Sequence, residues 1–329
     1  MKRYIFFILT LALFTSCYQE INLDEYRTAP KIVINCAAFT DVPLTASVTR
    51  TWFYTENTPY VKLPNAKVEL YVNDNFVEQM KWQPLKTETE TRSGVPDSVF
   101  ASGYVPKGGD RIKIVASNPG YQTVYAEDVV PHEVPIINLE HTERKVTINS
   151  QNYYYENGQM IEDKDYIEVT YNVTFQDIAD QDNYYVIQVS GPWNGGGYMY
   201  VDLSYIDPIL KDQNTVIDNA LGFDGVNNRS GCLFTDRDIK GKEYTLKLKE
   251  LISTRLSDSK KRRITLYSLS ESYYQYILSL QKVAGSTVSG GLGNIGFAEP
   301  IQVYSNVVDG TGILGTSQYD VRNIEISAE

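Results

Sequence analysis

Hydrophobic and polar residues alternate along much of this chain. Every second residue of 66–72 is apolar, and residues 166–175 alternate in the same way. A period of two residues places successive side chains on opposite faces of an extended segment, so both segments are predicted β-strands. The sequence Asn-Asp-Asn at 73–75 is typical of a turn, and residues 76–82 are predicted to return as the neighbouring strand.

Similar short strands, separated by turn residues, fill residues 31–130. About seven strands in roughly 100 residues, with turns roughly every 8–12 residues, are typical of an immunoglobulin-like fold. The run at 64–70 and the turns within 108–121 resemble carboxypeptidase-regulatory and transthyretin-like domains. We therefore predict a mostly-β chain with an N-terminal immunoglobulin-like or transthyretin-like β-sandwich domain over residues 31–130.

Two prolines, Pro131 and Pro135, bound the next segment. Proline has no backbone N–H to donate within a sheet, so neither residue suits a central strand. Residues 131–135 are therefore predicted to be a linker, and residues 136–329 a larger β-rich C-terminal domain.

This larger domain is predicted to contain one long amphipathic helix. Ser268 and Glu271 fit a capping box at its start, and Gly285 suits its C-terminal end. We place the helix at about 269–284, with its apolar stripe against the sheet of the second domain. After it, the glycines of 310–315 predict a tight turn before a last strand.

The first 16 residues have the features of a secretory signal. Lys2 and Arg3 precede about ten mostly apolar residues, which are too few to span a bilayer. Ser16 followed by Cys17 resembles the lipobox of bacterial lipoproteins, and this resemblance implies cleavage between them and acylation of Cys17. Several acyl chains, at about 0.8 kcal/mol per buried methylene, would anchor the chain to a membrane. The alternative is ordinary signal cleavage, with Cys17 incidental.

Residues 17–30 are predicted to be a tether. They open with an acidic leader that is interrupted by apolar residues. Such a leader resembles the surface-export signals of Bacteroidetes lipoproteins, which implies display on the cell surface. The alternative is a solvated spacer, with the protein on the periplasmic face.

Charge and composition narrow the classes of partner. Without Lys2 and Arg3, the 30 basic residues become 28, against 41 acidic residues, so the net charge of the mature chain is −13. This charge argues against a nucleic-acid partner, since phosphate binding needs clustered Lys and Arg. Tyrosine is abundant, with 26 residues. It mainly indicates β-sheet, although a carbohydrate- or ligand-facing surface would also use it.

The mature chain has two further cysteines, Cys36 and Cys232. An oxidising compartment would permit them to pair, but a disulfide requires Cα atoms within about 7 Å. We expect two buried thiols, and stability that comes from hydrophobic cores.

Several short motifs follow one another in a fixed order along the chain. They lie at residues 31–35, 44–48, 64–68, 182–186, 271–276, 297–300, 303–306 and 310–315. In this order they resemble the Bacteroidetes lipoprotein family named domain of unknown function 4249. Such lipoproteins often sit beside TonB-dependent outer-membrane receptors. The resemblance therefore implies an outer-membrane location and a receptor as a possible partner, but no activity.

The sequence offers little catalytic chemistry. His132 and His141 are its two histidines, and they have no spacing typical of a zinc site or a catalytic triad. Asp177, Asp180 and Asp182 lie close together and could offer oxygens to calcium. They lack the glycine and distal glutamate of an EF-hand, so we interpret them as a solvated hairpin turn. No catalytic residue, cofactor or metal is predicted.

These features predict a non-catalytic outer-membrane lipoprotein, exposed at the cell surface, that binds a nutrient or assists a TonB-dependent receptor. One alternative is an adhesin or structural surface protein. A second is a secreted glycan hydrolase, because acidic residues are abundant and a facing pair of carboxylates cannot be recognised from spacing.

Overall fold

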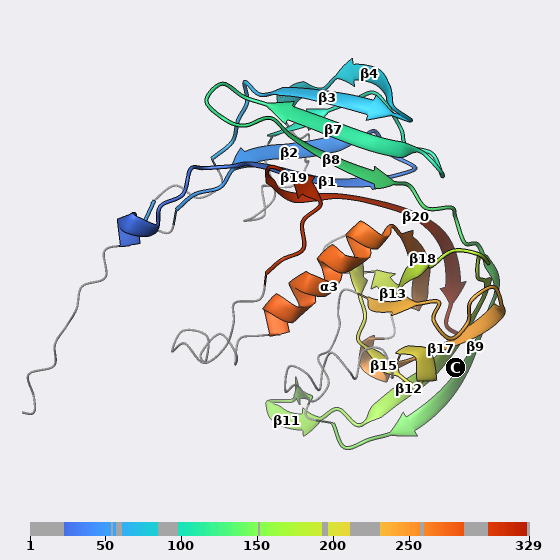
Figure 1. The fold of residues 1–329 in the computed structure, drawn as a ribbon. Coiled ribbons are helices and arrows are strands. Elements are labelled where there is room, and N and C mark those ends of the chain that lie inside the picture. The colour runs from blue at the N-terminus through green and yellow to red at the C-terminus, as the bar shows by residue number, and fades with distance from the viewer. Residues whose placement is uncertain are drawn as a thin grey trace, which may run out of the picture.

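The alternating segments form strands that assemble into four sheets (Figure 1). The computed structural model describes residues 23–53, 55–56, 61–84, 98–150, 152–192, 197–210, 231–256, 260–285 and 302–327. The prediction of a mostly-β chain is confirmed. The predicted strands at 66–72 and 166–175 are β3 (Lys67–Val72) and β12 (Asp165–Gln176), and alternate residues of both are buried.

The largest sheet has nine strands. Its order is β14 (Tyr198–Tyr200), β13 (Tyr184–Pro192), β18 (Lys261–Leu269), β20 (Thr311–Glu325), β1 (Ile32–Phe39), β2 (Thr45–Arg50), β6 (Ser98–Ala101) and β5 (Lys81–Pro84), and β16 (Cys232–Thr235) also pairs with β13. Residues from both ends of the chain therefore meet in one sheet.

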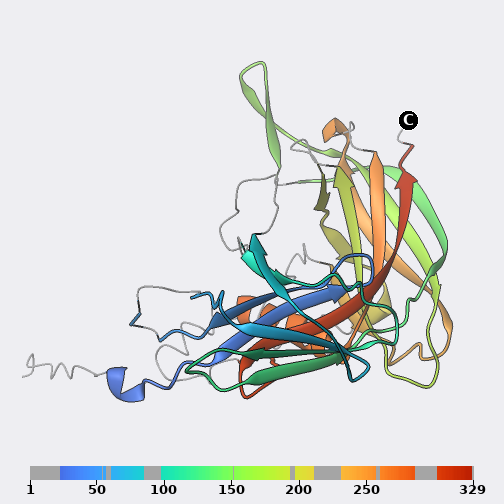
Figure 2. The ribbon, with the colours of Figure 1, turned by 90° about the horizontal axis from the view of Figure 1, so that it is seen from above.

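Three smaller sheets complete the β structure. The five-stranded sheet has the order β19 (Val307–Val308), β8 (Val124–Val129), β7 (Arg111–Ser117), β3, β4 (Asn75–Gln79). The four-stranded sheet has the order β15 (Leu203–Tyr205), β17 (Glu243–Ser253), β12, β9 (Ile136–Thr147). The remaining two strands, β10 (Tyr153–Glu156) and β11 (Gln159–Glu162), form a hairpin that projects from the rest of the molecule (Figure 2).

Strand β20 joins the N-terminal and C-terminal parts of the chain. Its first half runs parallel to β1, from the pair Val33–Thr311 to Phe39–Ser317. Its second half runs antiparallel to β18, from Leu269–Ser317 to Lys261–Glu325. The nine-stranded sheet is continuous because one strand serves both neighbours.

The five-stranded and the four-stranded sheet each pack on the nine-stranded sheet through a core of their own. The first core joins β1 and β2 to the five-stranded sheet, with Ile34, Val68 and Ile114 fully buried. The second joins β13 and β18 to the four-stranded sheet, with Tyr171 and Phe175 among its fully buried side chains. The immunoglobulin-like and transthyretin-like assignments, and the division at 131–135, stay predictions.

The structure corrects two predictions about single elements. Residues 76–82 are not one strand, because the chain crosses from the five-stranded sheet to the nine-stranded sheet at buried Met80. Residues 310–315 are not a tight turn, since β20 already begins at Thr311. The glycines here permit close approach: a Cβ on Gly312 would lie 2.0 Å from the carbonyl oxygen of Ile34.

The predicted helix is confirmed as α3 (Glu271–Gly285), but its cap differs from the expectation. Ser268 is a buried residue of β18, and Ser270 caps the helix instead, accepting a hydrogen bond from the Tyr273 N–H at 3.2 Å. The helix lies against the nine-stranded sheet (Figure 1), where Tyr274 packs with Val186. The described residues also include two short 3₁₀ helices, η1 (Leu23–Tyr26) and η2 (Thr254–Leu256). No helix among the described residues has both the length and the apolar character to cross a bilayer.

The second core contains a buried ion pair. The Arg262 guanidinium donates to the Glu250 carboxylate, with Nη2 2.8 Å from Oε1 and Nε 2.9 Å from Oε2, and both side chains are 5 % exposed. The Tyr171 hydroxyl donates to the same carboxylate at 2.6 Å, and burial raises the pKa of Tyr171. Loss of one partner would leave a buried charge unpaired, so this group requires close register between β12, β17 and β18.

A direct test of helix docking is Gly315→Ala. A Cβ at this position would lie 2.4 Å from Cδ2 of Tyr273, so α3 must move away from β20. We expect the free energy of unfolding in urea to fall by about 1–3 kcal/mol. The loss of unfolding free energy caused by Gly315→Ala should be smaller when Tyr273 is already replaced by Ala. An equal loss with Tyr273 present and with Tyr273→Ala would contradict the contact between Gly315 and Tyr273. Gly103→Ala is the control, because its Cβ would meet only Glu78 Oε1, at 3.8 Å.

Candidate functional site

A cleft of about 560 Å³ opens where three segments meet. We call it the junction cleft. The three segments are the end of β8, the turn between β12 and β13, and the start of α3, and they contribute residues that include Asp128, Asp182, Tyr184, Ser270 and Glu271. Arg111, the first residue of β7, also lines the cleft. Its volume is within the usual range for a small-molecule site. Polar and apolar residues both line it, and its charged residues are mostly acidic.

Asp128, one of the residues that line this cleft, ties together two strands and the start of a helix. Its Oδ2 atom accepts hydrogen bonds from the Ser270 hydroxyl at 2.5 Å and from the Thr316 N–H at 2.9 Å. Thr316 Oγ1 also lies 3.0 Å from Oδ2. One carboxylate therefore joins β8 to β20 and to the residue that caps α3.

Burial raises the pKa of Asp128 to about 6, and the hydrogen bonds from Ser270 and Thr316 oppose that rise only in part. The carboxyl group therefore takes up a proton in mildly acidic solution. Ser270 donates its hydroxyl proton to Asp128, and no histidine is among the residues that line the cleft. This arrangement can bind polar or cationic groups, but it does not activate the Ser270 hydroxyl as a nucleophile.

Two of the three aspartates considered as a calcium site, Asp177 and Asp182, have separate protein partners. Asp177 is buried and accepts from the Tyr185 hydroxyl at 2.5 Å and the Gly241 N–H at 2.6 Å. Asp182 accepts from Lys240 Nζ at 2.6 Å, and Asp180 takes a left-handed turn conformation with φ 65°. Within the described ranges, no group of three or more potential ligands could hold a metal ion.

The two histidines lie apart from the junction cleft. His141 is on β9, with Nε2 3.0 Å from Glu143 Oε1. His132 lies beside Gly109, whose Cβ would be 3.4 Å from its ring. Cys36 and Cys232 are both buried thiols, the first in the core under β1 and the second in the core under β13. Cys17 and Ser16, the predicted lipidation and cleavage residues, lie outside the described residues.

A second polar surface lies on the side of the nine-stranded sheet that α3 occupies. We call it the tyrosine face and define it by Tyr198, Tyr200, Arg263, Tyr267 and Tyr319. The Arg263 guanidinium stacks on the Tyr198 ring, 3.9 Å from its centroid. The Tyr267 and Tyr319 rings pair across β18 and β20, with centroids 5.4 Å apart.

Sequence reasoning missed the residues that form both surfaces. Asp128 and Ser270 are 142 residues apart in the sequence, and Ser270 and Thr316 are 46 residues apart. The only local signal was the serine at the start of the helix. The abundance of tyrosine is evident from the sequence, but the sequence does not show which strands pair and so bring the rings together.

These features define a β-rich protein with two distinct polar surfaces, the junction cleft and the tyrosine face. The chain belongs to the family Domain of unknown function (DUF4249), whose model matches residues 18–323. The search of curated proteins gave no match.

The raised pKa of Asp128 predicts an unusual pH dependence of stability. The ordinary carboxyl pKa is 3.8 and the folded value about 6, so the folded state holds this proton more tightly than the unfolded chain. The protonated Asp128 side chain therefore stabilises the folded state fully below about pH 4. This stabilisation, on the order of 3 kcal/mol, is lost as the pH rises through 6. Urea unfolding at several pH values should show that Asp128→Asn removes this loss.

Asp110 supplies a control of opposite sign. Burial would raise its pKa, but hydrogen bonds from Tyr104, the Lys107 N–H and Asn73 outweigh burial and lower it. Asp110→Asn should therefore cost more stability at neutral pH than in acid. If Asp128→Asn shows the same trend as Asp110→Asn, the assignment for Asp128 is wrong.

Proposed function

We propose that this protein is a non-catalytic, lipid-anchored outer-membrane lipoprotein, displayed at the cell surface, that binds a nutrient and assists a TonB-dependent receptor. Acylated Cys17 is its anchor, and residues 17–30 are its tether. The junction cleft is the observation that carries the binding role.

The composition of the junction cleft supports binding of a polar, preferably cationic, solute. Four carboxylates line it, from Glu127, Asp128, Asp182 and Glu271, beside the guanidinium of Arg111. Two of them also pair with lysines, Glu127 with Lys113 and Asp182 with Lys240. Tyr184 and Ser272 add hydroxyl groups. A cleft at the junction of separately packed cores is a common position for a ligand site.

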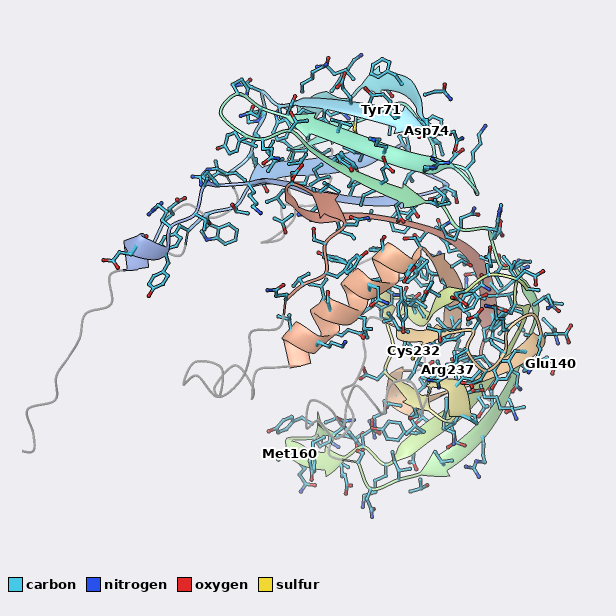
Figure 3. The ribbon with its side chains drawn as sticks, viewed as in Figure 1. Tyr71, Asp74, Glu140, Met160, Cys232 and Arg237 are labelled. Atoms are coloured by element: carbon cyan, nitrogen blue, oxygen red, sulfur yellow. The ribbon has the colours of Figure 1, made fainter. Side chains whose placement is uncertain are left out.

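The projecting hairpin of β10 and β11 supports a protein partner. Tyr153, Tyr155 and Met160 are 58 %, 77 % and 61 % exposed, and Figure 3 shows Met160 on the hairpin, away from the sheets. In the hairpin register Tyr155 pairs with Met160, so the two side chains form one outward patch. Such exposed aromatic patches mark interaction sites.

The hairpin is held in one orientation from its other face. The Arg255 guanidinium stacks on the Tyr154 ring, 3.3 Å from its centroid, and Asp163 at the base accepts from the Ser253 hydroxyl at 2.6 Å. A two-stranded hairpin is otherwise only marginally stable in water. An outward patch on a hairpin fixed in this way is well suited to contact a receptor.

The test is affinity purification of the tagged lipoprotein from detergent-solubilised outer membrane. We expect recovery of a TonB-dependent receptor with the native chain, and at least a tenfold lower recovery with Tyr155→Ser combined with Met160→Ser. Phe76→Ser is the matched control, because Phe76 is 55 % exposed on a strand of the five-stranded sheet.

Recovery of no receptor, under conditions that retain known complexes, would contradict the receptor role. Equal receptor recovery with the Tyr155→Ser, Met160→Ser variant would support the receptor role but show that the hairpin is not the contact surface. Failure of Cys17→Ser to release the chain from the membrane fraction would contradict the anchor.

Two other functions have weaker support. An adhesin or structural surface protein would also use the exposed hairpin, but it would not need the junction cleft. A glycan hydrolase would use a protonated carboxyl in an acidic cleft as general acid, a role that the raised pKa of Asp128 would suit. However, Asp128 is only 9 % exposed, and its Oδ2 atom is already held by Ser270 and Thr316.

A further inference from the structure

The tyrosine face consists of side chains that the alternation of β18 and its neighbours turns away from the second core. Ile264 and Leu266 point into that core, so Arg263 and Tyr267 point to the opposite side of the sheet. The same alternation places Tyr319 of β20 beside Tyr267. Strand β14, at the edge of the sheet, adds Tyr198 and Tyr200.

The rings are accessible and are held by polar partners. Tyr198 and Tyr200 are 42 % and 50 % exposed. Arg263 covers one side of the Tyr198 ring, and the Tyr319 hydroxyl donates to the Asp41 carboxylate. The Tyr198 and Tyr319 rings are therefore restricted in orientation, which lowers the entropy cost of ordering them when a ligand binds.

The Tyr267 and Tyr319 hydroxyl groups stay protonated at neutral pH. Burial raises the pKa of Tyr267 to about 12, with a further contribution from the nearby hydroxyls of Tyr200 and Tyr319. The hydrogen bond to Asp41 raises the pKa of Tyr319. The face therefore offers neutral phenol groups, beside one guanidinium and one carboxylate.

This combination excludes two classes of ligand. A nucleic acid needs several clustered basic side chains, and Arg263 is the one basic residue of the tyrosine face. An acyl chain would bury the charges of Arg263 and Asp41 without pairing them, which costs free energy. A neutral oligosaccharide fits the tyrosine face. The C–H faces of its sugars stack on aromatic rings, and its hydroxyls bond to guanidinium, carboxylate and phenol groups.

We propose that the tyrosine face is a carbohydrate-binding platform for a neutral oligosaccharide, separate from the junction cleft. Tyr198 and Tyr200 stack on successive sugar rings, and Arg263 bonds to the hydroxyls of these rings. Asp41, which bonds to Tyr319 on β20, can accept from a sugar further along the oligosaccharide. The platform does not depend on the receptor role, because none of its residues lies on the hairpin.

The test is isothermal titration calorimetry of the full mature chain with six defined hexasaccharides: cellohexaose, xylohexaose, mannohexaose, maltohexaose, laminarihexaose and chitohexaose. We expect at least one to bind. Tyr200→Ala should weaken that binding about tenfold, the loss of one aromatic contact of about 1.4 kcal/mol. Tyr200→Phe should retain most of it, since the ring remains.

Tyr125→Ala is the matched control. Tyr125 is 37 % exposed on β8 and has Lys113 stacked 4.5 Å from its centroid, so it repeats the cation–tyrosine arrangement on another sheet. The Tyr125→Ala variant should bind the hexasaccharide with the same affinity as the native chain. Unchanged thermal unfolding of the Tyr200 variants shows that lost binding is local.

Two results would overturn this proposal. The first is no binding of any of the six hexasaccharides. The second is binding that Tyr200→Ala and Tyr125→Ala weaken equally. Self-association that Tyr200→Ala abolishes, without sugar binding, would instead make the face a contact between copies of the chain. In the affinity purification, the Tyr200→Ala chain should recover as much receptor as the native chain. The sugar-binding proposal and the receptor proposal can therefore fail independently.

Discussion

The shared pairing of β20 is the constraint on which the rest of the structure depends. Thr311 to Ser317 pair with β1 near the start of the chain, and Ser317 to Glu325 pair with β18. Without this strand, the half of the nine-stranded sheet that contains β1 and β2 would be separate from the half that contains β13 and β18. Both candidate sites depend on the joint, because Thr316 bonds to Asp128 in the junction cleft and Tyr319 lies in the tyrosine face.

The strand can occupy this position because its glycines admit close neighbours on both sides. Gly312 passes against the backbone of Ile34, and Gly315 lies under Tyr273 of α3. A larger side chain at either position would push apart β1 and β20, or lift the helix. The motif that looks like a turn in the sequence is therefore a packing motif.

The fold could be predicted from the sequence where the signal is local. Alternation located β3 and β12, and the apolar spacing after Ser270 located α3. The parallel pairing of β1 with β20 could not be predicted, because strands that are far apart in sequence leave no short-range pattern. The candidate sites were missed for the same reason. Asp128 looks like any acidic residue in a strand until Ser270 and Thr316 are brought to it.

The central claim is that β20 makes the two cores one cooperative unit. Hydrogen exchange of the native protein, followed by mass spectrometry in increasing urea, measures the opening free energy of individual strands. If β20 joins the cores, amides of β1 and of β18 should lose protection at the same urea concentration. If β1 exchanges while β18 remains protected, or the reverse, the two parts unfold independently and the claim is contradicted.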